Sequence, residues 1–161
     1  MPRNATSHTT GNIYAFKIAA NSYAFARLVF SIPSSIYLME IFNHRSNTAN
    51  LPSNTALPPV LIPFECVYPK VVSGKPWNWI IVSKDQNFTP PDRKLLEELE
   101  LVTGICEVSK FDPDWTENCG RMLWKSKRRI AMDEYQELDK SSLSMNRALN
   151  PQLLIADLRR H

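Results

Sequence analysis

The sequence predicts a single α+β domain that is mostly β, a small sheet or barrel-like fold with one or two peripheral helices. Three apolar runs near the N-terminus, at 13–18, 23–30 and 36–42, are rich in aromatic and β-branched residues, which pack well on a pleated, half-buried surface. Each run carries apolar groups on both faces, which indicates a sheet covered on both sides or a small barrel. Signals for helix starts occur later, at Thr89 and Asn150.

The alternation of side chains along a strand assigns the residues of these runs to faces. The first run places Tyr14, Phe16 and Ile18 on one face. In the second run, the small Ala24 and Ala26 would let a neighbouring element approach closely. We interpret the aromatic residues of all three runs as core, because aromatic side chains in strands mostly pack.

A polar segment at 43–59, rich in Asn, Ser, Thr and Pro, lacks apolar periodicity and predicts a long surface loop. Loops of this length inside a compact domain are often functional or disordered. Two further apolar runs follow at 60–68 and 77–82, and the second contains Trp77 and Trp79 on one strand face. Buried core is the favoured interpretation of this pair, although an exposed pair could anchor a partner.

Two helices are predicted in the second half of the chain. Thr89 is the expected N-cap of the first, with Pro90 at its first position and Gly104 as its stop. Its apolar stripe would consist of Leu95, Leu96 and Leu99. The second is predicted over 150–160 from its Asn-Pro start. It must dock on the sheet through its leucines, since a helix of about ten residues is marginal alone.

The strongest basic cluster is the segment 121–130, which also holds Trp124. One interpretation is a solvated strand face whose long side chains cover Trp124. The other is a binding surface, but nucleic acid is disfavoured because the net charge is only +3 and recognition needs a contiguous basic patch. The candidate partner-binding residues of the whole chain are Trp77, Trp79, Lys125, Lys127, Arg128 and Arg129.

Cysteine usage and hydropathy favour a cytoplasmic protein. The three cysteines form no Cys-x-x-Cys pair, and an odd, sparse set fits reduced thiols better than a disulfide scaffold. No run approaches the roughly 20 apolar residues that a membrane helix needs. Residues 1–10 are predicted to be a disordered tail, followed by one domain at 11–161.

The sequence assigns no catalytic, cofactor-binding or metal-ligating residue. Its histidines are His8, His44 and His161, which are far apart in the sequence and have no ligand spacing typical of zinc. Phosphate-loop, dinucleotide and nucleophile-elbow motifs are also missing from the sequence. We therefore predict that the protein is not an enzyme and uses no cofactor or metal.

Three N-terminal segments read Gly-Asn-Ile-Tyr-Ala-Phe at 11–16, Tyr-Ala-Phe-Ala-Arg-Leu-Val at 23–29 and Met-Glu-Ile-Phe at 39–42. Near the C-terminus, Asp-Glu-Tyr-Gln-Glu-Leu at 133–138 is followed by the predicted helix. Together, these segments resemble the bacterial immunity protein 26 family. Asn12 stands where the family commonly has Asp, and Ala26 where Gly is common.

The resemblance implies a mostly β protein that protects its producer by binding a cognate polymorphic toxin. The mild positive charge argues against an acidic mimic of nucleic acid and favours steric occlusion, through an interface of about 800 Å² per side. The alternative is an SH3-like or barrel binding module for peptide or nucleic acid, using the tryptophans or the basic segment. An enzyme with an unrecognised site ranks below both.

Overall fold

The computed structural model describes residues 9–32, 36–51, 57–67, 72, 79–111, 113, 124–138 and 144–145. Five strands form the first sheet, in the order β4-β3-β2-β1-β5. Their bounds are β1 Asn12–Ala19, β2 Ser22–Ile32, β3 Ile36–Ser46, β4 Val60–Val67 and β5 Ile80–Lys84. All pairings in this sheet are antiparallel. The three apolar runs of the sequence are therefore adjacent strands, as their pattern predicts.

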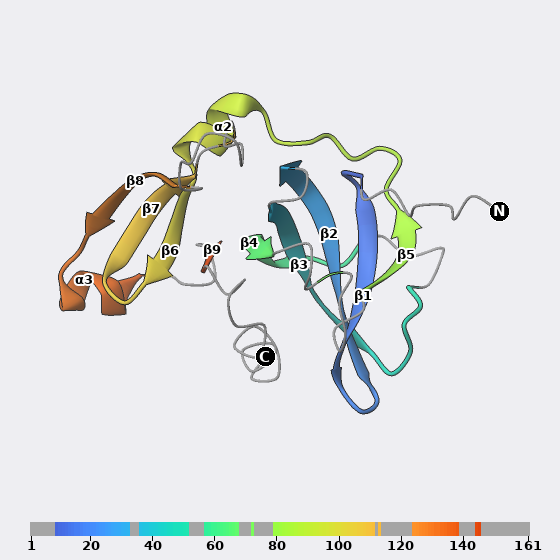
Figure 1. The fold of residues 1–161 in the computed structure, drawn as a ribbon. Helices are drawn as coiled ribbons and strands as arrows, with labels where there is room; N and C mark the ends of the chain where they lie inside the picture. The colour runs from blue at the N-terminus through green and yellow to red at the C-terminus, as the bar shows by residue number, and fades with distance from the viewer. Residues whose placement is uncertain are drawn as a thin grey trace.

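A smaller sheet follows in the order β8-β7-β6-β9. Its strands are β6 Glu100–Gly104, β7 Glu107–Phe111, β8 Trp124–Arg129 and β9 Ser144–Met145, and β9 runs parallel to β6. Helix α2, Arg93–Glu98, leads into β6, and helix α3, Met132–Glu137, follows β8. The two sheets lie side by side, with α2 above the space between them (Figure 1). Neither sheet closes into a barrel over the described residues. The prediction of a mostly β fold with peripheral helices is therefore confirmed, and the fold is built from sheets and not from a barrel.

Apolar side chains cover both faces of the five-stranded sheet. One face carries the larger cluster, which includes Tyr14, Phe16 and Ile18 as the alternation predicts. The opposite face carries Ile13, Ala15, Phe25 and Phe42. Between the sheets, the rings of Phe30 in β2 and Phe111 in β7 meet edge to face at 6.0 Å.

The predicted surface loop at 43–59 is partly regular structure. Strand β3 continues to Ser46, and the Asn43 backbone N–H donates to the Pro59 carbonyl at 2.7 Å. Ala49 and Leu51 pack against the smaller apolar cluster of the sheet. The polar composition of this segment gave no sign of these contacts, because the apolar packing of its described part involves just two side chains.

Helix α2 begins later than its sequence signal predicts, and Thr89 is not its N-cap. Asp92 caps the helix, since its Oδ1 accepts a hydrogen bond from the Leu95 N–H at 2.8 Å. The reason is steric: Pro90 precedes Pro91 and therefore avoids the helical region, so it cannot be the first helical residue after a Thr89 cap. The helix also ends at Glu98 and not near Gly104, because 100–104 pairs with β7.

Both predicted chain ends fall largely outside the described residues. Residues 1–8 of the predicted tail and the whole of the predicted helix at 150–160 lie outside the part of the chain that the structure describes. Thr9 lies within the described chain, where its carbonyl accepts from the Asn12 N–H and its hydroxyl accepts from Lys84 Nζ at 3.2 Å. Hydrogen bonds therefore link Thr9 to Asn12 of β1 and Lys84 of β5.

Candidate functional site

A partly buried ion cluster is centred on Arg27 of β2. Its Nε donates to Glu40 Oε2 at 2.7 Å, and its Nη1 donates to Asp85 Oδ2 at 2.8 Å. The side chains of Arg27, Glu40 and Asp85 are 14%, 18% and 21% exposed. At this degree of burial each charge depends on its partners more than on water, so the three residues act as a unit.

The sheet itself sets this geometry. Arg27 and Glu40 are direct partners across β2 and β3, where side chains on one face meet. Asp85 follows β5, on the far side of β1. Its N–H donates to the Gly11 carbonyl at 2.9 Å, while the Gly11 N–H donates to the Leu28 carbonyl at 2.8 Å.

Gly11 allows the chain to approach Asp85 this closely. Its φ is +87°, and a Cβ atom there would lie 2.8 Å from the Asp85 carbonyl oxygen. Glycine adopts this backbone conformation without the steric cost that other residues incur. The Gly-Asn start of the first segment is therefore a structural requirement of the loop that carries Asp85.

Two aromatic rings complete the surroundings of the Arg27 guanidinium. Its Cζ lies 4.4 Å from the centre of the Phe88 ring and 5.6 Å from that of Phe42. The second oxygen of Asp85 accepts from the Asn87 N–H at 3.0 Å. Charges held by partners and covered by rings stabilise a structure, and they offer no group poised to exchange a proton with a substrate.

Tyr14 forms a second polar point within the core. Burial raises the pKa of Tyr14 to about 12, a hydrogen bond with Asn12 lowers it in part, and Tyr37 nearby adds to the rise. Burial also raises the pKa of Tyr37. Both phenols therefore stay protonated at neutral pH and serve as neutral core groups.

Residues 124–129 of the predicted basic cluster form strand β8, and carboxylates from neighbouring elements face Lys127 and Arg128. Lys127 Nζ lies 3.5 Å from Glu107, while Arg128 lies 3.1 Å from Glu100 and 3.6 Å from Glu134. Hydrogen bonding to Glu100 raises the pKa of Arg128. Lys127, Arg128 and Arg129 are exposed, and Lys125 belongs to the same strand. The structure thus brings together four of the six candidate residues, in a setting of mixed charge.

The structure describes only one of the two candidate tryptophans, Trp79, and it is not exposed. Trp79 is buried, and its ring stacks on Phe16 at 4.0 Å with 9° between the planes. Its core interpretation is therefore confirmed, whereas Trp77 lies outside the described residues. His44 packs its ring 5.4 Å from that of Phe25.

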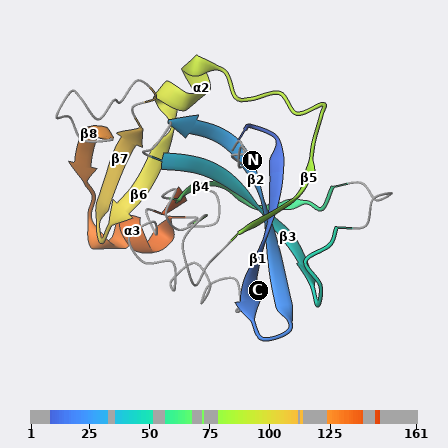
Figure 2. The ribbon, with the colours of Figure 1, turned by 45° about the vertical axis from the view of Figure 1, so that its right-hand side comes forward.

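Sequence reasoning missed one exposed surface that contains large apolar side chains. It comprises Ile105, Cys106, Arg129, Ala131 and Met132, and we call it the hairpin-end patch. Ile105 is 74% exposed and Met132 is 52% exposed. Cys106 Sγ lies 4.0 Å from Met132 Sδ, and the Ile130 N–H donates to the Cys106 carbonyl at 3.0 Å. Both ribbon views place α3 at the end of the β6–β7 hairpin (Figures 1 and 2).

Searches for other kinds of site gave negative results. Over the described ranges, no group of three or more His, Cys, Asp or Glu side chains could hold a metal ion. In the same part of the chain, no helix is both long and apolar enough to cross a membrane. No family model, curated protein or solved structure matches the chain.

Proposed function

We propose that this chain is an immunity protein that binds a cognate bacterial toxin in the cytoplasm and neutralises it by steric occlusion. The observation that carries the proposal is the direct pairing of Arg27 with Glu40. Both residues come from segments that resemble the immunity protein 26 family. Gly11, from the first such segment, positions the loop of Asp85 against the same arginine.

The Arg27 cluster supports a binding scaffold and not a reaction centre. Each carboxylate of the cluster bonds to Arg27, and Phe42 and Phe88 flank the guanidinium. A general acid or base needs access to substrate and a free proton position. The residues shared with the family therefore hold three strands in register, which is what a rigid binding protein requires.

Two observations weigh against the alternative binding module. Trp79 lies in the core, so it is not an exposed aromatic anchor for a peptide. The carboxylates of Glu100, Glu107 and Glu134 face the cations of β8, which lowers the positive potential that nucleic acid would meet.

Co-expression in a bacterial host tests the proposed function. Genes next to the one for this chain are screened for toxicity, and a toxic one is induced with the chain or with an empty vector while growth is followed. We expect the chain to restore growth, and an unrelated immunity protein to fail. Growth no better than with the empty vector would contradict the proposal.

A further inference from the structure

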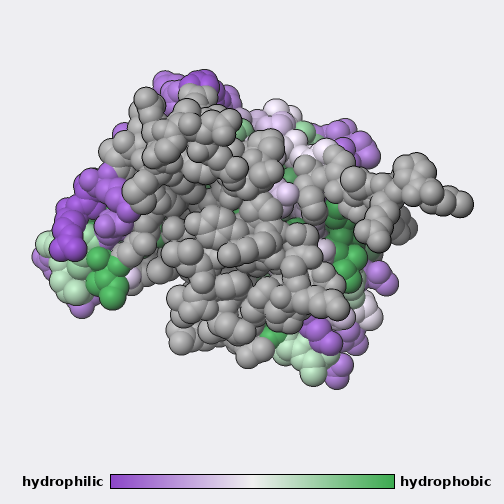
Figure 3. Space-filling view, in the orientation of Figure 1, coloured by the Kyte–Doolittle hydropathy of each residue, from purple (hydrophilic) through white to green (hydrophobic). Residues whose placement is uncertain are grey.

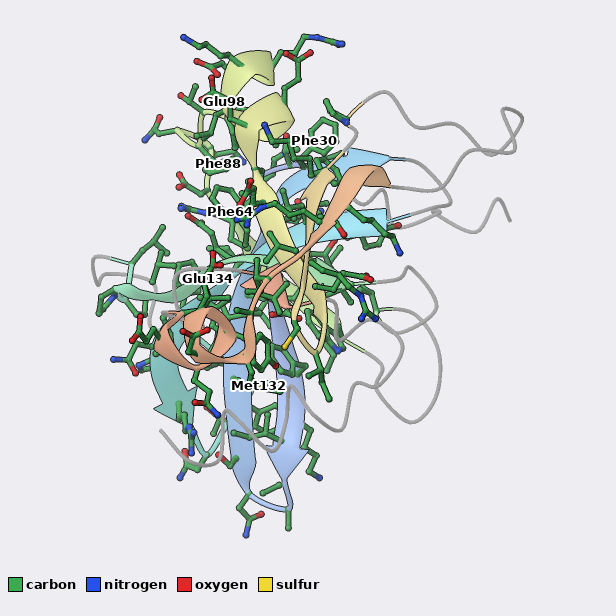
Figure 4. All side chains as sticks on the ribbon, turned by 90° about the vertical axis from the view of Figure 1, so that its left-hand side faces the viewer. Phe30, Phe64, Phe88, Glu98, Met132 and Glu134 are labelled. Atoms are coloured by element: carbon green, nitrogen blue, oxygen red, sulfur yellow. The ribbon has the colours of Figure 1, made fainter. Side chains whose placement is uncertain are left out.

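The hairpin-end patch lies between two short elements of opposite charge. Strand β8, Trp-Lys-Ser-Lys-Arg-Arg, contains four basic residues and no acidic one. Helix α3, Met-Asp-Glu-Tyr-Gln-Glu, contains three acidic residues and no basic one. The hydrophobic atoms at this end of the smaller sheet are exposed beside hydrophilic ones (Figure 3). Figure 4 shows Met132 and Glu134 together on α3.

Two large apolar side chains of the patch are exposed on neighbouring elements. Ile105 and Met132 are the large apolar members of the patch, and they are 74% and 52% exposed. Apolar side chains surrounded by charged ones are typical of an interface, whose centre is apolar and whose rim is polar. Methionine also adapts its shape readily to an opposing surface.

The charge pattern identifies the partner, because it is complementary to itself. A two-fold axis through the patch would place β8 of one protomer against α3 of its partner, twice. In a two-fold interface the same surface meets itself, so the apolar groups of both protomers can meet at the centre. Lys127 and Arg128 already face carboxylates of their own chain, so the cation that remains for the partner is Arg129. Arg129 is exposed, and none of the described residues forms an ion pair with it, while Asp133 is exposed beside Met132.

We propose that the hairpin-end patch is the contact surface of a two-fold dimer of this chain. Ile105 and Met132 of both protomers form its centre. Arg129 of each protomer pairs with Asp133 of its partner at the rim. The small apolar centre makes this a weak, concentration-dependent dimer. The proposal is independent of the toxin, since both of its surfaces belong to this chain.

Sedimentation equilibrium of the purified chain over a range of concentrations tests the dimer. We expect the mass to rise from 18.5 kDa towards twice that value. Met132→Asp should weaken association at least about tenfold, because it places a charge in the apolar centre. Leu95→Asp is the matched control, since Leu95 is an apolar residue of α2 that is 47% exposed. It should associate as the unmodified chain does.

A charge-exchange experiment identifies the rim contact. Arg129→Glu alone and Asp133→Lys alone should each stay monomeric, because each brings like charges together at both rim contacts. An equimolar mixture of the two variants should dimerise, since both contacts then join opposite charges. Circular dichroism melting checks that each variant is folded.

Three outcomes would overturn the proposal. They are a mass that stays at 18.5 kDa at every concentration, association that survives Met132→Asp but not Leu95→Asp, and charge variants that do not recombine. None of these outcomes bears on growth protection by the chain, so failure of the dimer and failure of the proposed function remain distinguishable.

Discussion

Arg27 and Asp85 lie 58 residues apart in the sequence, yet Arg27 Nη1 donates to Asp85 Oδ2 at 2.8 Å. The contact passes over β1, which separates β2 from β5 in the sheet. Together with the Glu40 pairing, it joins β3, the central strand β2 and the residue that follows the edge strand β5. The stability of the sheet should therefore depend strongly on this one guanidinium.

Replacing Arg27 with Ala should lower the free energy of unfolding by about 2–4 kcal/mol, because two partly buried carboxylates lose their partner. Urea denaturation measures the change. Arg93→Ala is the control, since the Arg93–Glu97 pair is exposed on α2 and such pairs contribute about 0.5 kcal/mol or less. Equal losses in the two variants would show that the cluster has no special role.

Gly11→Ala should destabilise the protein by about 1–3 kcal/mol, because alanine is strained at positive φ and its Cβ would meet a backbone oxygen. That oxygen is the Asp85 carbonyl, at 2.8 Å from the ideal Cβ position. Thermal unfolding would record the loss as a lower Tm. A variant with unchanged Tm would mean that the 85–88 turn can shift without cost.

Stability should fall in alkaline solution as the pH rises from about 10 to 12, and Tyr14 is the main cause. Its pKa is about 12 in the folded chain, above its value in the unfolded chain. The stabilisation is therefore complete below pH ~10 and is lost as the pH approaches the folded pKa. Urea midpoints between pH 8 and 11.5 measure this, and Tyr14→Phe should flatten the decline. An equally steep decline in that variant would assign the effect to other groups.

Sequence reasoning predicted most of the five-stranded sheet, because its signals are local. Alternation placed Tyr14, Phe16 and Ile18 on one face, and the usual burial of tryptophan placed Trp79 in the core. The N-cap at Asp92 was missed because Pro91 overrides the capping signal of Thr89.

The Arg27 cluster and the hairpin-end patch were harder to predict, because they depend on contacts between distant segments. Nothing near Arg27 in the sequence identifies Asp85 as its partner, since the link is made by the backbone of Gly11. Ile105 and Met132 lie far apart in the sequence, and no local pattern links them. Their exposure on one surface follows from the placement of α3 at the end of the β6–β7 hairpin.

A labelled DNA or RNA duplex should show no tight binding to the chain, because carboxylates face the cations of β8. Fluorescence anisotropy at low and moderate salt measures this. Replacing Glu100, Glu107 and Glu134 with Gln should create weak binding that salt abolishes, since it exposes the positive strand. Tight binding by the unmodified chain, with a steep salt dependence, would contradict this prediction and favour the alternative function of a nucleic-acid binding module.

The central claim is tested most directly by titrating a candidate toxin, the purified product of a gene next to the one for this chain, with the chain itself. Residual toxin activity is measured against added chain, and His44→Ala is run in parallel. Steric occlusion predicts a linear loss of activity that ends at a fixed molar ratio, identical for the variant. Silencing of excess toxin by trace amounts of the chain, abolished by His44→Ala, would contradict the account and require an enzyme.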